Sequence, residues 1–178
     1  MSDEITITPT PIPPGRRRAI QASTTLLHEW AATQPWVAGP WYELRLGPTR
    51  MFSPYAQLTP QIEAMLRRSN WYADLVGVTA TEVQVIEAKV VITPAAIGQL
   101  EHYVALVPGT EALRPYASRH VVPVLLVGVD DDVIHQMAVN KGIRVIVSSP
   151  SWLQEYLLSR YFRRRQLNRA DLNNEPEE

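Results

Sequence analysis

The chain contains no cysteine, which excludes disulfide bonds, zinc–thiolate centres and cysteine nucleophiles. It also lacks any apolar run near the length of a membrane span, and its acidic N-terminus is not followed by an apolar segment. We therefore expect neither a membrane span nor a secretion signal. An excess of charge of one sign is missing as well, with 17 basic against 18 acidic residues. Any contact with a nucleic acid must then come from local clustering of charge.

Lysine is almost absent too. The basic residues are fifteen arginines and only two lysines, Lys89 and Lys141. Lys89 closes the apolar segment Val-Ile-Glu-Ala-Lys at residues 85–89, two positions after Glu87. A lysine kept beside a glutamate on an apolar strand, in a chain that otherwise uses arginine, indicates chemistry rather than surface charge.

What is present fits a single domain. A length of 178 residues with 46% hydrophobic residues is enough to bury a core. Four prolines in residues 5–15 remove backbone donors and favour extended chain, so residues 1–15 are predicted to be a flexible proline-rich arm. Residues 16–166 form the predicted domain, and residues 167–178 a polar tail.

Hydrophobic periodicity and turn residues predict an alternation of helices and strands. Helices are expected at 16–32, 60–68, 94–107, 131–140 and 151–165, and strands at 41–46, 71–78, 82–92, 121–129 and 143–147. The strands at 71–78 and 82–92 are separated by a short loop at 79–81, so we expect them to pair antiparallel. This order predicts an α/β fold with a central mixed sheet flanked by helices.

The strand at 82–92 carries the most informative residues. Side chains alternate along a strand, so Glu87 and Lys89 point to the same face. Asp74 lies on the preceding strand with the parity of Val76 and Val78, and the hairpin brings it towards Glu87 and Lys89. Two carboxylates offer hard oxygen ligands for Mg²⁺, and the lysine can orient or deprotonate an attacking water or offset charge on phosphorus. The alternative is an ordinary ion pair between strand residues.

The next helix supplies context that this short pattern lacks. Gln99 and Tyr103 are spaced i and i+4, so they share one face of the helix expected at 94–107. The alternative for these two residues is a helix face packed on the sheet, with its polar tips outward.

Taken together, these residues resemble the PD-(D/E)xK nuclease superfamily. That family has an αβββαβ core with an aspartate on one strand, E-x-K on the next, and in its RecB-like branch a Q-x-x-x-Y helix. Asp74, Glu87, Lys89 and the Gln99–Tyr103 pair match these positions, and the spacing is also similar to that of Holliday-junction resolvases. The chain departs from the motif where Ala73 replaces the proline. The resemblance implies a restriction-endonuclease-like core with an added C-terminal strand and helices.

The resemblance also implies roles for individual residues. Asp74, Glu87 and the carbonyl of Ala88 would bind Mg²⁺, or Mn²⁺ in its place, and Lys89 would serve the attacking water. Gln99 would steady the site and contact phosphate, with Tyr103 as a weaker candidate for the same role.

Many members of the family add a glutamate from the first core helix. Glu63 and Glu29 both qualify, although a solvated helix face explains either of them as well.

Two charged clusters lie elsewhere in the chain. The C-terminal helix carries Arg160 and the run Arg163, Arg164 and Arg165, interleaved with aromatic residues, which suits contacts with DNA phosphates and unpaired bases. The alternative is a solvated helix end whose cations complement the helix dipole. Asp130, Asp131 and Asp132 resemble a metal cluster, but a cap for the following helix explains them better.

The sequence therefore predicts a Mg²⁺-dependent DNA nuclease, an endonuclease rather than an exonuclease, in a cytoplasmic or virion-associated setting. The alternative is a protein with the nuclease fold that acts as a structural or adaptor component of a phage particle or DNA-processing complex, without cleavage. DNA is the expected partner, and a homo-oligomer or a protein complex docked through the N-terminal arm is compatible with the chain.

Overall fold

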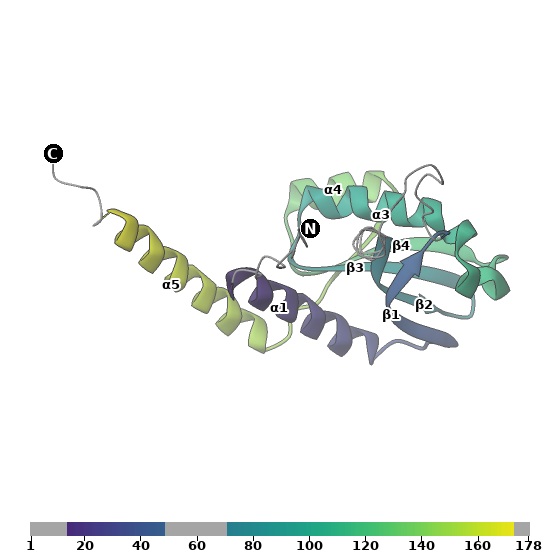
Figure 1. Cartoon of the computed structure of the whole chain (residues 1–178), viewed down its shortest axis with the longest axis horizontal. Helices are drawn as coiled ribbons and strands as arrows, with labels where there is room; N and C mark the ends of the chain where they lie inside the picture. Colours follow the sequence, from purple (N-terminus) through teal and green to yellow (C-terminus); the bar gives the residue numbers. More distant parts are fainter. Residues whose placement is uncertain (1–13, 49–70, 173–178) are drawn as a thin grey trace, which may run out of the picture.

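A computed structural model of the chain describes residues 14–48 and 71–172, with side chains described for residues 20–48 and 71–162. Figure 1 shows the helices and strands, whose bounds in chain order are α1 (Pro14–Ala31), β1 (Ala38–Leu46), β2 (Trp71–Val78), β3 (Glu82–Val91), α3 (Pro94–Leu106), the 3₁₀ helices η1 (Val107–Gly109) and η2 (Glu111–Tyr116), β4 (His120–Val129), α4 (Asp132–Asn140), β5 (Arg144–Val147) and α5 (Trp152–Leu172).

The five strands of the described residues form one sheet, in the order β1-β2-β3-β4-β5. β1, β2 and β3 pair antiparallel, whereas β3, β4 and β5 pair parallel. The parallel pairs need crossover connections, which α3 and α4 provide. The predicted hairpin between β2 and β3 is confirmed, since the Thr79 N–H donates to the Glu82 carbonyl at 2.9 Å. The predicted α/β fold with a mixed sheet is confirmed with it.

Helices cover both faces of this sheet (Figure 1): α3 and α4 lie on one side and α1 on the other. The central strand β4 is consequently apolar on both faces. Its Val124 and Leu126 belong to the cluster that contains Leu26 and Leu27 of α1, whereas Leu125 packs in the cluster on the α3 side. Burial from both sides explains why this strand reads as a continuous apolar run rather than an alternating one.

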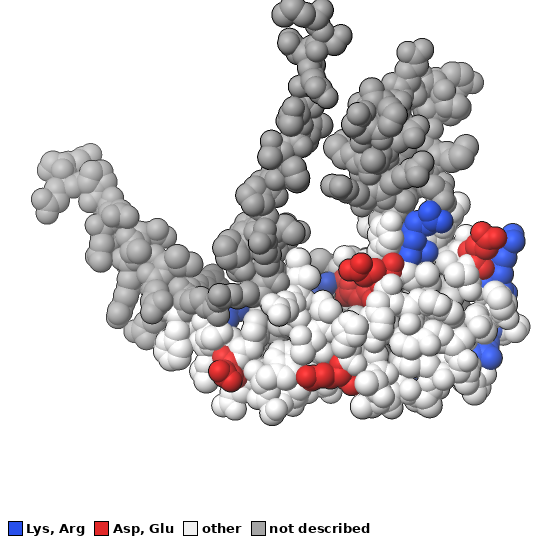
Figure 2. Space-filling view, turned by 60° about the horizontal axis from the view of Figure 1, so that its bottom comes forward, with Lys and Arg blue, Asp and Glu red and all other residues white. Residues whose placement is uncertain are grey.

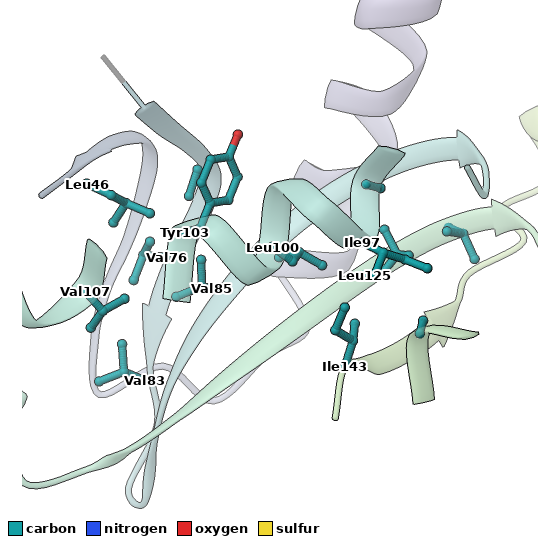
Figure 3. Close-up of a cluster of buried hydrophobic side chains, with 14 of the residues drawn as sticks. Leu46, Val76, Val83, Val85, Ile97, Leu100, Tyr103, Val107, Leu125 and Ile143 are labelled. Atoms are coloured by element: carbon teal, nitrogen blue, oxygen red, sulfur yellow. The ribbon is translucent and has the colours of Figure 1, made fainter. Parts of the chain in front are cut away.

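The larger cluster lies between α3 and the sheet. Figure 3 shows Ile97 and Leu100 of α3 among side chains contributed by several strands. Leu100, Val76 and Leu125 are fully buried, and Tyr103 follows one turn later on the same face of the helix. The helical spacing of these positions places one side of α3 in the core, as predicted.

The last helix is different, because the packed side chains among its described residues, 152–162, lie near its start. Leu153 is 5% exposed and lies with Ala22 of α1 and Val90 of β3. Further along, Leu158, Tyr161 and Phe162 are between 49% and 60% exposed. Figure 1 shows α5 extending away from the sheet past α1. None of the helices in the described ranges is both long enough and apolar enough to cross a membrane.

The ends of several elements differ from the predicted ones. α1 begins at Pro14 rather than at residue 16, because proline fits the first turn of a helix, where its missing N–H costs nothing. α5 runs to Leu172 rather than to Arg165 and so includes part of the predicted tail. Residues 166–172 contain neither glycine nor proline, so nothing in them stops the helix.

Three further findings concern single segments. The 3₁₀ helices η1 and η2 were not predicted, since short helices of this kind leave no periodic signal. The predicted cap is confirmed, because Asp131 accepts bonds from the N–H groups of Val133 and Ile134 at 3.1 Å. The helix predicted at 60–68, and with it Glu63, lies outside the described residues.

Candidate active site

The candidate site lies where the sheet divides. β2 and β3 pair only over residues 75–78 of β2 and residues 83–86 of β3, from Leu75↔Ile86 to Val78↔Val83. Beyond this point β2 continues beside β1, while β3 continues beside β4. We call this opening, between residues 71–74 and residues 87–91, the fork. The fork adjoins a pocket of about 400 Å³ between α1 and the sheet, and Asp74, Ala88 and Lys89 are part of the pocket lining.

Asp74 bridges the two strands at the base of the fork. Its Oδ2 accepts a hydrogen bond of 2.9 Å from the Ala88 N–H. Had the ladder continued in register, Ala88 would have faced Ala73, so the carboxylate replaces a backbone acceptor. The N–H and C=O of one strand residue point to the same side, which directs the Ala88 carbonyl into the fork as well. Asp74 and the Ala88 carbonyl are therefore close together.

The strand around Asp74 does not follow the regular alternation of faces. Val76 and Val78 lie in the core cluster on the α3 side, but so does Ala73, an odd number of residues away. The alternation of faces is thus broken between Ala73 and Leu75, and the assignment of Asp74 to the face of Val76 and Val78 stays a prediction. The Asp74 side chain reaches the Ala88 N–H, where the missing ladder leaves room for it.

Glu87 and Lys89 share one face of β3, as predicted. The Lys89 Nζ and the Glu87 Oε1 form an ion pair. Glu87 is only 2% exposed, whereas the lysine side chain is 30% exposed and reaches the pocket. The second carboxylate oxygen, Glu87 Oε2, accepts no hydrogen bond from an N–H or O–H donor in the described part of the chain, and the Asp74 carboxyl is the acidic neighbour of Glu87. Buried oxygens of this kind are compensated by a proton shared between the two acids or by a cation.

The two carboxylates influence each other's protonation. Burial and the nearby Asp74 charge raise the pKa of Glu87 to about 7, although the Lys89 ammonium opposes this shift. Burial also raises the pKa of Asp74, against the hydrogen bond from Ala88 and the charge of Lys89. Shifts of this kind mark two acids held close together away from water, with one ammonium between them.

The Gln99–Tyr103 pair approaches the same cluster from α3. Tyr103 is 4% exposed, and Figure 3 shows its ring beside the apolar cluster with its hydroxyl pointing away from the labelled aliphatic side chains. Burial first, and then the charges of Glu87 and Asp74, raise the pKa of the Tyr103 phenol well above its usual range, while a hydrogen bond with Gln99 counteracts them. The ring is therefore part of the core, and its polar end faces the carboxylates.

One residue near the site was missed by the sequence analysis. Glu43 of β1 stands opposite Asp74, as the neighbouring register pairs Tyr42↔Leu75 and Leu44↔Ala73 show. It lines the same pocket, and its charge contributes to the raised pKa of Asp74, after burial. Its φ of 48° lies in the left-handed region that non-glycine residues rarely adopt. No local signal marks Glu43, because its position depends on the register between two strands.

Other candidates lie elsewhere. The Glu29 carboxylate accepts hydrogen bonds from the Trp152 Nε1 at 2.9 and 3.0 Å, so it ties α1 to α5 and is not part of the pocket lining. Arg160 is exposed on α5, and the backbone of Arg163, Arg164 and Arg165 continues the same helix, away from the fork. The side chains of these three arginines are outside the described set.

The oxygen atoms at the fork fit the coordination that Mg²⁺ prefers. Among the described residues no three His, Cys, Asp or Glu side chains are grouped as metal ligands, so a closed cage of the structural zinc type does not fit. Mg²⁺ takes one or two carboxylates and keeps water or substrate oxygens in its other positions. Asp74, the unpartnered oxygen of Glu87 and the Ala88 carbonyl meet that requirement.

Comparison of the chain with family models, with curated proteins and with solved structures gives no match. The chemistry of the site must therefore be argued from its own geometry.

Proposed function

We propose that the protein is a Mg²⁺-dependent DNA nuclease, an endonuclease of the PD-(D/E)xK kind. The observation that carries the proposal is Glu87, a buried carboxylate with one unpartnered oxygen, held beside Asp74 at the fork of the sheet. The α/β architecture with a mixed sheet is compatible with that superfamily.

The energetic cost of the cluster supports a functional role. Two carboxyl groups are desolvated at one place, and Lys89 can balance the charge of only one of them, so the other must hold a proton or be balanced by a cation. Buried charges that are not fully compensated reduce stability, so a protein that used the fold only as a scaffold would gain by replacing them with apolar residues. A divalent cation offsets the remaining charge, which makes the pair favourable in the loaded protein.

The residues at the fork have different proposed roles, according to where they lie. Asp74, Glu87 and the Ala88 carbonyl would hold Mg²⁺ or Mn²⁺, which polarises a phosphoryl oxygen and lowers the pKa of water when bound. Lys89 pairs with Glu87, lines the pocket, and orients the attacking water or offsets charge on phosphorus. Tyr103 and Gln99 act behind Glu87, as residues that position the carboxylate.

The arginines of α5 are proposed to contact the DNA backbone. Arg160, Arg163, Arg164 and Arg165 fall within two turns of one helix, which concentrates positive charge in a chain of balanced composition.

The proposal is tested by cleavage and by metal binding together. Supercoiled, linear, single-stranded and branched DNA are incubated with the full chain and Mg²⁺ or Mn²⁺. We expect cleavage by the wild type and a loss of at least about 100-fold with Asp74→Asn, Glu87→Gln or Lys89→Met, since each removes a charge at the reacting centre. The matched control is Glu101→Gln, an exposed acid on α3 that pairs with Lys141 away from the fork, and it should cleave like the wild type.

Metal binding gives a readout that does not depend on turnover. Mn²⁺ titration by calorimetry should show one site in the wild type and none in Asp74→Asn or Glu87→Gln. Failure to cleave any of these DNAs, together with failure to bind Mn²⁺ in a manner that depends on these acids, would rule out the nuclease.

The alternative is a non-cleaving structural or adaptor protein of a phage particle or DNA-processing complex. The observation that favours it is the exposed apolar surface of α5, where Leu158, Tyr161 and Phe162 have no cover among the described residues. This alternative predicts neither cleavage nor metal binding, so the two measurements above separate it from the nuclease.

A further inference from the structure

The pocket beside the fork is larger than a metal site requires. Its volume of about 400 Å³ falls within the range of small-molecule sites. Its lining includes the charged residues Asp74 and Lys89 and the apolar residues Ile20 and Leu27 of α1. The pocket therefore joins an apolar compartment to the two charged groups to which we assign the chemistry.

An aromatic pair stands at the edge of this compartment. His28 of α1 and Tyr42 of β1 both line the pocket, and their rings stack with centroids 4.1 Å apart and planes at 17°. Both residues remain exposed, Tyr42 by 38%. An exposed flat π-surface of this kind suits a nucleobase, which stacks on aromatic side chains irrespective of its identity.

The charges at the pocket determine where the phosphate of a nucleotide lies. Glu43 lines the pocket from β1, and its carboxylate repels a phosphate group. The Lys89 ammonium and the cation proposed at Asp74 attract the backbone. The base then has the apolar wall and the stacked rings, and the phosphate has the reacting centre.

Size excludes a paired nucleotide from this arrangement. A base pair within a stacked duplex is too large to enter a compartment that has the volume of a small-molecule site. A paired base reaches such a compartment only by leaving the stack, at a cost of a few kcal/mol that single-stranded or frayed DNA avoids. On the face shown in Figure 2, the described Lys and Arg side chains lie in small separate groups rather than in one stripe that would follow a duplex.

We propose that this pocket binds one unpaired nucleotide next to the scissile phosphate, with its base against His28 and Tyr42 and its backbone at Asp74 and Lys89. The preferred substrate class is therefore DNA that is single-stranded or locally unpaired at the cleaved position. This inference rests on the proposed nuclease function and names its substrate.

The test measures binding without cleavage. A single-stranded oligonucleotide that contains 2-aminopurine is titrated with the full chain in Ca²⁺, because stacking quenches the fluorescence of this base. The proposal expects quenching by the wild type, retained by Tyr42→Phe and lost with Tyr42→Ala, whose affinity should fall about 5- to 150-fold. The control is Val133→Ala, an exposed apolar residue of α4 on the other side of the sheet, which should bind like the wild type. The same strand in a duplex should bind at least about tenfold more weakly.

A second measurement separates stacking from a structural role of the ring. His28→Ala removes the other half of the pair from α1 and should also reduce quenching, while Mn²⁺ titration and the melting temperature should show both variants folded and able to bind metal. Equal affinity for duplex and single strand, or unchanged quenching in Tyr42→Ala, would overturn the inference. Either result leaves the nuclease standing as long as cleavage and Asp74-dependent metal binding persist, so the two failures are distinguishable.

Discussion

At the scale of single residues, Asp74 and Glu87 give the site two properties at once. Asp74 completes the hydrogen bonding of β3 through the Ala88 N–H, so it supports the strand that carries the other acid. Glu87 is buried with one oxygen unpartnered and with its pKa raised by burial and by the Asp74 charge. The same contacts that shape the site therefore make the protein sensitive to pH.

Stability should fall as the pH rises through the range in which Glu87 ionises. Its pKa is about 7 in the folded protein and near the ordinary 4.5 in the unfolded chain, so the folded state holds a proton that the unfolded state has already released. The raised pKa of Asp74 acts in the same direction. Replacing Glu87 by Gln removes the ionisation, so relative to the wild type the variant should gain on the order of 3 kcal/mol between about pH 4.5 and about pH 8.

Urea unfolding at the two pH values measures this difference. Glu101→Gln is the control, because the side chain of Glu101 is 46% exposed and lies away from the fork. Mg²⁺ should restore stability to the wild type at the higher pH and leave Glu87→Gln unchanged. A gain for Glu87→Gln that is the same at both pH values would contradict the assigned pKa.

The face of a strand residue could be predicted from the sequence where the strand alternates regularly, and could not be predicted where the alternation is broken. Glu87 and Lys89 lie on a strand paired continuously with β4, so alternation placed them on one face correctly. Asp74 lies where the alternation is broken, so parity alone does not determine its face, although the hairpin brings it close to Glu87. Glu43 depends on a register between β1 and β2 that no pattern of single residues encodes.

At the scale of elements, the pocket depends on how α1 is seated against the sheet. Trp36 follows α1, and its Nε1 donates to the Ala31 carbonyl at 2.9 Å. Its ring lies against Gly77 of β2, where a Cβ would approach ring atoms well inside 3.0 Å. The missing side chain at Gly77 therefore allows the end of α1 to close on β2.

Adding one methyl group at this contact should be costly. We expect Gly77→Ala to lower the free energy of unfolding by roughly 1–3 kcal/mol, because the Trp36 ring must move out of a packed position. Gly98→Ala is the matched substitution, since Gly98 is exposed on α3 with nothing within 4 Å of the added carbon. It should raise stability by roughly 0.5–1 kcal/mol through helix propensity. Thermal unfolding of both variants checks the pair, and equal effects would show that Trp36 is not confined.

The order of elements was predictable because each carries its own periodic or turn signal, and the boundaries were less so. α1 begins earlier than predicted because Pro14 fits the first turn of a helix, and α5 ends later because residues 166–172 contain neither glycine nor proline. The division of β2 from β3 was not predictable, because it arises from pairing partners rather than from composition.

At the scale of the whole molecule, positive and negative charges are balanced in number, but the basic residues are unevenly distributed. The chain has 17 basic and 18 acidic residues, and four of the arginines lie close together on α5. α5 extends past α1 and away from the sheet (Figure 1), so these arginines lie apart from the pocket. If the α5 arginines carry most of the long-range attraction to DNA, replacing them should weaken DNA binding without altering the site.

Salt dependence measures that contribution. Replacing Arg160, Arg163, Arg164 and Arg165 by Gln should reduce the slope of log affinity against log salt by about 0.7 for each lost phosphate contact with single-stranded DNA, about 3 in total. The weakening should be the same for all sequences. Arg114→Gln, an exposed arginine of η2, serves as the control. An unchanged slope would show that α5 does not bind the backbone and would leave its exposed apolar residues to another partner.

The sheet is built in the order in which the chain is synthesised, because each strand lies beside its neighbour in sequence. On the ribosome, each strand can be added to an edge that already exists, and early misregistration is limited to adjacent partners. α1 is made first but rests on β3 and β4, which emerge later. α1 can pack against the sheet only when these strands are in place, so the α1 wall of the pocket is completed after the strands that carry Asp74, Glu87 and Lys89.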